Sequence, residues 1–240
     1  MSAETGFTKD NLDLCLKALA KEYRKINGTA VPAELILIGG AAVLAGYGFR
    51  NMTYDIDAII HASSAMDDAA VRVSDKFGLP SGWLNSDFTR TRSYSPKLVQ
   101  YSRYYKTFSN VLAIRIVSGE YLIAMKLMSG RQYKNDLSDI IGILKEEQNA
   151  GTPVTFDKID KAICELYGSW AQVHDISKTM MNEIKACNDF DALYKKITVE
   201  EKRTKSQLSD FDRSYPEVLN EDNIDSIILA LKRKKGTSEP

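Results

Sequence analysis

The chain has 240 residues, with 32 Lys+Arg against 32 Asp+Glu, 44% apolar residues, 2 His and 3 Cys. This length suits one large domain or one and a half, and the charge balance argues against binding nucleic acid by bulk charge alone. Two histidines and three widely spaced cysteines predict neither a multi-histidine metal site nor structural zinc or a disulfide framework. Because no apolar run approaches roughly 18 residues and no signal-peptide pattern begins the chain, we expect a cytoplasmic protein without a membrane partner.

The first eighty residues alternate between helix and strand signals. Apolar residues at helical spacing over 8–27 predict an amphipathic helix. The apolar run 34–38 predicts a buried strand, which Gly39-Gly40 ends before a short helix rich in small residues. A second strand is expected over 54–60, and a further helix from Ser64 to Phe77.

The next segment mixes loop, hairpin and helix signals. Residues 79–96 have no steady period and several turn formers, which predicts a long loop. Strands over 98–105 and 111–117 are expected to form a hairpin. Helical spacing then begins, with helices predicted over 121–128 and 136–148.

The remainder of the chain, after Pro153, has helical spacing throughout. The basic run 232–235 is expected to complement the dipole of the last helix, with a nucleic-acid patch as the alternative. We therefore predict an α+β protein with an αβ domain over 1–150 and a helical domain over 151–240.

Gly39 and Gly40 follow a strand and open a helix. Backbone N–H groups at such a turn can approach a phosphate, because no Cβ stands in the way and the helix N-terminus favours an anion. The plainer alternative is a tight turn without a ligand.

Asp55 and Asp57 flank Ile56 within the second predicted strand. Side chains on a strand alternate between faces, so both carboxylates are expected on one side, roughly 6–7 Å apart. Two unpaired carboxylates repel each other, and a hard divalent cation such as Mg²⁺ relieves that repulsion. The alternative is a pair of solvent-facing acids on an edge strand.

The segment LIGG, a short helix and then TYDIDAII resembles the signature of the nucleotidyltransferase superfamily related to DNA polymerase β. Downstream, YLIAMKLMSGRQYKNDLSDIIGIL is similar to a segment of the AbiEii-like abortive-infection branch and related uncharacterised branches. The resemblance covers about residues 34–145. It implies a small mixed β-sheet flanked by helices.

The resemblance also implies site roles and a cofactor. Asp55 and Asp57 would hold Mg²⁺ or Mn²⁺ for phosphoryl transfer, while the turn at Gly39 and Gly40, with Thr53, would bind the triphosphate of an NTP. In the downstream segment the matching positions are Lys126, Leu127, Arg131, Asp136, Asp139 and Ile140. Of these, Lys126 would act at the catalytic site by touching a phosphate, and Arg131, Asp136 and Asp139 would belong to the nucleotide site.

The same downstream segment has a plainer interpretation. Acids are favoured in the first turn of a helix, so Asp136 and Asp139 could simply begin one, with Arg131 as their partner. Lys126, on an apolar helix, would then extend outward to solvent.

One position departs from the superfamily pattern, which usually adds a third carboxylate on a later strand. The expected strand VLAIRIV carries Arg115 instead, and Asp87 or Glu120 would have to substitute. The alternative to an active enzyme is therefore a catalytically degenerate fold that binds a nucleotide or a partner protein. A third interpretation is a helical interaction protein whose αβ half is only a scaffold.

Basic and aromatic residues interleave over 90–108, a pattern that suits a single-stranded RNA end, or simply packed tyrosines beside solvated cations. Trp83 is expected to line the mouth of the site or to anchor its loop. The function predicted overall is Mg-dependent transfer of NMP from an NTP to a nucleic-acid or protein hydroxyl. The resemblance further implies a toxin–antitoxin or phage-defence setting with an antitoxin partner.

Overall fold

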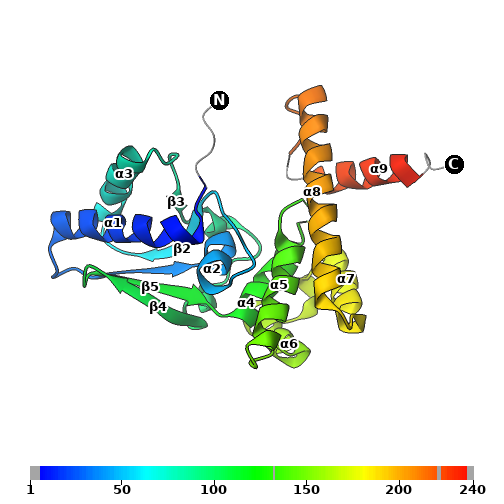
Figure 1. Cartoon of the computed structure of the whole chain (residues 1–240), viewed down its shortest axis with the longest axis horizontal. Helices are drawn as coiled ribbons and strands as arrows, with labels where there is room; N and C mark the ends of the chain where they lie inside the picture. Colours follow the sequence, from blue (N-terminus) through cyan, green and yellow to red (C-terminus); the bar gives the residue numbers. More distant parts are fainter. Residues whose placement is uncertain (1–5, 132, 221–222, 237–240) are drawn as a thin grey trace.

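The computed structural model describes residues 6–131, 133–220 and 223–236, with side chains to residue 231. Figure 1 shows two lobes side by side. We call residues 6–118, which contain the β-sheet, the sheet lobe, and residues 119–236, which are helical, the helical lobe. The elements of the sheet lobe are α1 (Lys9–Asn27), β1 (Ala33–Leu37), α2 (Gly39–Gly46), β2 (Ile56–His61), α3 (Ala65–Phe77), β3 (Leu84–Asn85), the 3-10 helices η1 (Asp87–Arg90) and η2 (Pro96–Val99), β4 (Ser102–Phe108) and β5 (Leu112–Val117).

The sheet has five strands in the order β3-β2-β1-β5-β4. β1 is antiparallel to β2, with Leu37 opposite Ala58, and parallel to β5. β2 is parallel to β3, and β4 is antiparallel to β5. This mixed sheet with flanking helices confirms the predicted α+β class. Because β1 and β2 run in opposite directions, the end of β1 meets the start of β2 at one edge of the sheet.

Local sequence explains most element boundaries. Thr8 caps α1, and Gly28, with φ of 69°, follows its last residue. The hairpin between β4 and β5 turns at Ser109 and Asn110, both with φ of 53°, the backbone that a tight hairpin turn requires.

Two boundary predictions were wrong. The strand expected from Leu98 begins at Ser102, because Pro96 starts a 3-10 helix. The region expected as a loop contains β3 and η1. The Ile56 N–H donates to the Trp83 carbonyl (2.7 Å), and this hydrogen bond holds the segment against β2.

The core of the sheet lobe lies beneath α1 and α3, which pack together on one side of the sheet (Figure 1). Leu12, Leu16 and Leu19 of α1 are fully buried, as their spacing predicts. Trp83 is also buried, and its indole N–H donates to the Ala70 carbonyl (3.1 Å), so it anchors its segment to α3.

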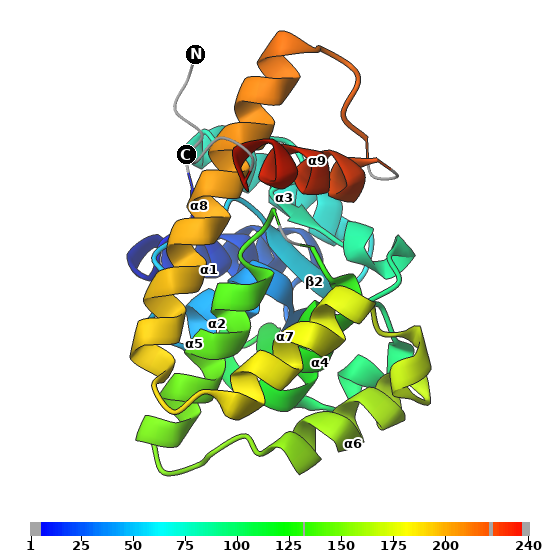
Figure 2. The same cartoon turned by 90° about the vertical axis from the view of Figure 1, so that its right-hand side faces the viewer.

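The helical lobe consists of α4 (Gly119–Ser129), α5 (Asp136–Asn149), α6 (Phe156–Tyr167), η3 (Trp170–Gln172), α7 (Asp175–Ala186), α8 (Phe190–Ser214) and α9 (Ile224–Gly236). α4 packs against α5, α6 and α7, and α5 packs against α8. α9 crosses the C-terminal half of α8 (Figure 2). Within the described ranges, no helix has the length and apolar character that crossing a membrane requires. The basic side chains of 232–235 lie outside the described residues.

The basic and aromatic residues of 90–108 are mostly engaged in packing. Tyr94, Tyr101 and Tyr105 pack against the core, while Tyr104 is 63% exposed. Lys106 pairs with Asp13. These contacts match the packed-tyrosine alternative.

Candidate functional site

The glycine turn lies against Asp57. The Ile38 N–H donates to the Asp57 carbonyl (3.0 Å), which brings the end of β1 to the start of β2. Gly39 has φ of 54°, and a Cβ at this position would lie 3.2 Å from Asp57 Oδ2. A larger residue at 39 would therefore strain the backbone and crowd the carboxylate.

Gly40 faces a second wall formed by Thr53 and Arg50. A Cβ on Gly40 would lie 2.5 Å from Thr53 Oγ1 and 2.9 Å from an Arg50 guanidinium nitrogen. Thr53 is buried and exchanges backbone hydrogen bonds with Phe7 (2.6 and 2.9 Å). The turn is thus bordered by a hydroxyl and a cation, and only glycine leaves room for both.

The two predicted metal-binding acids differ in their surroundings. Asp55 is exposed and precedes β2, which begins at Ile56, so the expectation that both acids lie within the strand was wrong. Asp57 is half-buried on β2. Burial and the nearby Asp55 raise the pKa of Asp57 to about 6, against the opposing influence of Lys134, Arg131 and Asn85. The pair is therefore short of positive charge.

Asn85 of β3 lies opposite Asp57 of β2. Its amide N–H donates to the Gly82 carbonyl (3.2 Å), and its side chain lowers the pKa of Asp57, which favours the charged form. The side chain that β3 places beside Asp57 is therefore a neutral amide and not a third carboxylate.

Arg115 does not lie at this edge, although its strand was the one expected to carry a third carboxylate. It lies on β5, on the far side of β1 from β2, opposite Ile36 of β1. Its guanidinium donates to Ser102 Oγ of β4 (2.8 Å). Of the suggested substitutes, Asp87 is exposed and its N–H donates to Asn85 Oδ1 (3.0 Å), while Glu120 lies in the first turn of α4, in electrostatic range of Tyr47.

A buried ionic network joins α4, α5 and the sheet lobe. Lys126 Nζ lies 2.7 Å from Asp139 Oδ2 and 3.1 Å from Asp136 Oδ1. Arg131 pairs with Asp136 (3.0 Å), and Arg50 pairs with Asp139. The structure therefore brings the downstream residues together and links them through Arg50 to the glycine turn.

The ion pairs of this network outweigh the effect of burial on the pKa values of its members. Burial would by itself raise the pKa of Asp136, but Lys126 and Arg131 hold it below its ordinary value. Burial would likewise lower the pKa of Lys126, but Asp139 and Asp136 raise it. Lys126 is only 7% exposed, so the plainer alternative, in which it extends to solvent, was wrong. Its contact with a phosphate stays a prediction.

Glu201 of α8 holds the first turn of α5. Its carboxylate accepts from the N–H groups of Leu137 and Ser138 (3.2 and 3.1 Å) and from the Ser138 hydroxyl (2.5 Å). Burial raises the pKa of Glu201 to about 6, although the hydrogen bonds from Ser138 oppose that shift. α8 thereby fixes the turn that carries Asp136 and Asp139.

Sequence reasoning missed Arg50, Asn85, Lys134 and Glu201. Arg131 and Lys134 lie in the α4–α5 loop, in electrostatic range of Asp57. The only signal for Lys134 was its place in the segment that resembles the superfamily. Nothing local marks the other three, because each acquires its neighbour through packing of distant elements.

The acids fit one type of metal site. Within the described residues, no group of three or more His, Cys, Asp or Glu side chains is arranged to hold a metal ion. Asp55 and Asp57 remain as a pair whose mutual repulsion a hard cation would relieve. Mg²⁺ commonly takes one or two protein carboxylates and completes its shell with substrate phosphates and water, so the donor set fits such an ion.

Comparison with known proteins identifies a family for this chain. The model of a family described as nucleotidyltransferase of unknown function (DUF6036) matches residues 15–165, more than half of the chain. None of the curated proteins matches it. Among solved structures, the chain is similar to an antigenic nucleotidyltransferase-like protein from Paracoccidioides brasiliensis, with 16% identity, coverage of 74% of this chain and 95% of the other, and a TM-score of 0.37.

Proposed function

Because the chain belongs to the family of nucleotidyltransferases of unknown function, we propose that it is an enzyme that transfers NMP from an NTP to an acceptor hydroxyl with Mg²⁺ or Mn²⁺. The observation that carries this proposal is the closeness of the Asp57 carboxylate to the glycine turn, since a Cβ added to Gly39 would lie 3.2 Å from Asp57 Oδ2. A carboxylate that can hold a cation thus adjoins a turn whose backbone can approach a phosphate.

The roles proposed for the residues follow from their positions. Gly39 and Gly40 begin α2 and have no side chain to keep a phosphate away from their backbone. Their N–H groups would therefore bind phosphate oxygens. Arg50 and Thr53 border the turn and would orient the same phosphates. Arg131 and Lys134 would supply positive charge from the loop facing Asp57.

Asp55 and Asp57 would hold the divalent ion. When bound, that ion neutralises charge on the phosphates of the nucleotide. Lys126, Asp136 and Asp139 would act chiefly by fixing Arg50 and Arg131, because their charges already satisfy one another in the buried network. The residues of the chain thus supply positioning and electrostatic stabilisation, the main protein contributions to phosphoryl transfer.

Label transfer tests the proposal. The protein is incubated with each α-labelled NTP and Mg²⁺, with total RNA and with cell lysate as acceptors. We expect label on a defined acceptor with the wild type and none with Asp55→Ala or Asp57→Ala. Asp68→Ala, at an exposed acid of α3, is the control and should retain transfer. Equal transfer by wild type and both Asp variants would contradict the proposal.

A second function is favoured by Asn85. A neutral amide opposite Asp57 leaves the site with less negative charge than three carboxylates would supply, which suits a module that binds a nucleotide or partner without turnover. Nucleotide-dependent stabilisation that persists in EDTA, with no label on any acceptor, would support this alternative.

The acceptor and biological setting are further proposals. We propose a nucleic-acid or protein acceptor and a toxin–antitoxin or phage-defence role with an antitoxin partner, on the resemblance of the Lys126–Ile140 segment to the abortive-infection branch. Growth arrest on expression of the wild type, absent with Asp57→Ala, would support a toxin. Normal growth with active transfer would contradict it.

A further inference from the structure

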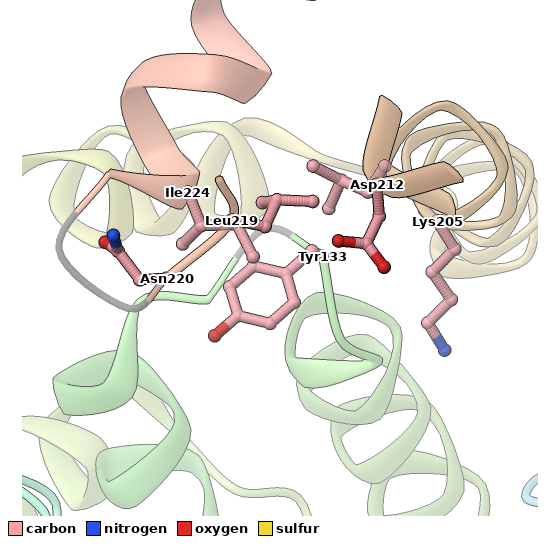
Figure 3. A pocket seen from close by; sticks show the side chains of 7 residues that line it. Tyr133, Lys205, Asp212, Leu219, Asn220 and Ile224 are labelled. Atoms are coloured by element: carbon pink, nitrogen blue, oxygen red, sulfur yellow. The ribbon is translucent and has the colours of Figure 1, made fainter. Parts of the chain in front are cut away.

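A cavity of about 460 Å³ lies beyond the α4–α5 loop, between α8 and the start of α9 (Figure 3). This volume is within the range of small-molecule sites. Its described lining comes from three segments: Tyr133 of the loop, Leu208 and Asp212 of α8, and Leu219 before α9 with Ile224 at the start of α9. The cavity is therefore bounded by the helical lobe and by the loop that carries Arg131 and Lys134.

The lining combines an aromatic plane with apolar walls and one carboxylate. In Figure 3 the Tyr133 ring lies beside Leu219 and Ile224, and the Asp212 carboxylate points toward the ring. Lys205, also at the edge, is directed elsewhere, since its Nζ donates to Asn135 Oδ1 (2.7 Å). Such a lining suits a flat heteroaromatic ring that stacks on Tyr133 and donates a hydrogen bond to Asp212.

The cavity and the candidate site share one short loop. Arg131 pairs with Asp136 of the buried network and interacts electrostatically with both Asp57 and Tyr133. Lys134, on the other side of Tyr133 in the chain, also acts on Asp57. One ligand could therefore place anionic groups at Arg131 and Lys134 and an aromatic ring against Tyr133.

From this arrangement we infer that the cavity binds the base of the nucleotide whose triphosphate lies at the glycine turn, and that it favours bases with an exocyclic amino group. The inference rests on the proposed function. Adenine, guanine and cytosine each carry an amino donor that a carboxylate can accept. Uracil offers a single N–H between two carbonyl oxygens, which an anionic acceptor repels.

Equilibrium binding of non-hydrolysable analogues of ATP, GTP, CTP and UTP, beside inorganic tripolyphosphate, tests this in Mg²⁺ buffer with the full chain. We expect wild type to bind the three amino-bearing nucleotides at least fivefold more tightly than the UTP analogue. Asp212→Asn should remove that preference and leave tripolyphosphate affinity unchanged. Asp210→Asn, an exposed acid two residues away on α8, is the matched control and should behave as wild type.

Tyr133→Ala provides an independent readout. It should weaken all four analogues about tenfold and leave tripolyphosphate binding unchanged, with an unaltered melting temperature. Unchanged nucleotide affinity in both Tyr133→Ala and Asp212→Asn would overturn the inference, as would parallel loss of tripolyphosphate binding in Tyr133→Ala. Even if the inference about the base is overturned, the proposed function holds when tripolyphosphate binds to wild type and not to the double variant Asp55→Ala,Asp57→Ala. If neither tripolyphosphate nor any analogue binds to wild type, the proposed function fails as well.

Discussion

Asp57 on β2 lies directly opposite Asn85 on β3, and the Asn85 side chain favours the charged form of the Asp57 carboxyl. The contact joins a predicted metal-binding residue to a strand of only two residues. A neutral amide favours the ionised form of Asp57 without adding a third negative charge, so this edge of the sheet carries two carboxylates and one amide.

Asn85→Asp should make the fold more dependent on a divalent ion. A third carboxylate beside Asp57 adds like-charge repulsion, which should lower the free energy of unfolding by about 1 kcal/mol or more without metal. Mg²⁺ should restore most of that loss. Melting temperatures at pH 8, with and without Mg²⁺, measure both effects. Asn85→Ala removes the amide without adding charge, and an equal Mg²⁺ response from both variants would contradict the prediction.

Asp57→Asn should stabilise the protein at pH 8 and should stabilise it by about half as much at pH 5. The pKa of Asp57 is about 6 in the folded protein, above its ordinary value of 3.8, so the folded state binds this proton more tightly than the unfolded state. Stability of the wild type therefore falls as pH rises from about 4 to 6. The amide avoids this loss, with an expected gain of about 1–2 kcal/mol at pH 8 after allowance for partial exposure.

Urea unfolding of the wild type and Asp57→Asn at both pH values gives the measurement. Asp55→Asn, at the exposed acid, should show a smaller gain. The same stabilisation by Asp57→Asn at pH 5 and pH 8 is the result that this explanation does not allow.

Lys126→Met should destabilise the fold by about 3–5 kcal/mol, because it leaves Asp136 and Asp139 buried without their shared cation. Adding Asp136→Asn and Asp139→Asn should recover part of the loss. The control Lys145→Met breaks an exposed pair with Asp191 and should cost at most about 1 kcal/mol. Chemical denaturation distinguishes the outcomes, and similar losses from both lysine variants would show that the network contributes little.

Glu201→Ala should loosen the first turn of α5. It removes the acceptor of two backbone N–H groups and of the Ser138 hydroxyl, at a cost of about 1–3 kcal/mol. Glu201→Gln keeps one carbonyl oxygen and should lose less. Amide hydrogen exchange at Leu137 and Ser138 reports the change directly. Equal exchange in wild type and Glu201→Ala would exclude this role.

Arg115→Gln should leave nucleotidyl transfer unchanged, since Arg115 lies across β1 from the candidate site and bonds to Ser102. The label-transfer assay compares this variant with Asp57→Ala. Loss of transfer in a folded Arg115→Gln protein would contradict this prediction and show that Arg115 contributes to the site.

The sequence by itself determined those features that depend on neighbours along the chain. The helical spacing of Leu12, Leu16 and Leu19 predicted α1, because residues three and four apart share one face of a helix. The Gly39-Gly40 pair, a short helix and then Asp55 and Asp57 gave the resemblance that assigned the turn and the acids to one site. The family match agrees with the resemblance read from these motifs.

Only the tertiary structure decided which distant residues face the site residues that the sequence predicted. β3 is too short for side-chain alternation to reveal it, so the pairing of Asn85 with Asp57 depends on how the segment after Trp83 packs against β2. Arg50 meets Asp139, and Glu201 meets Ser138, across 89 and 63 positions of chain. The first contact forms where the two lobes pack together, and the second where α8 packs against α5 within the helical lobe. Local periodicity carries no information about them, because it records only which face of an element is apolar and not which element covers it.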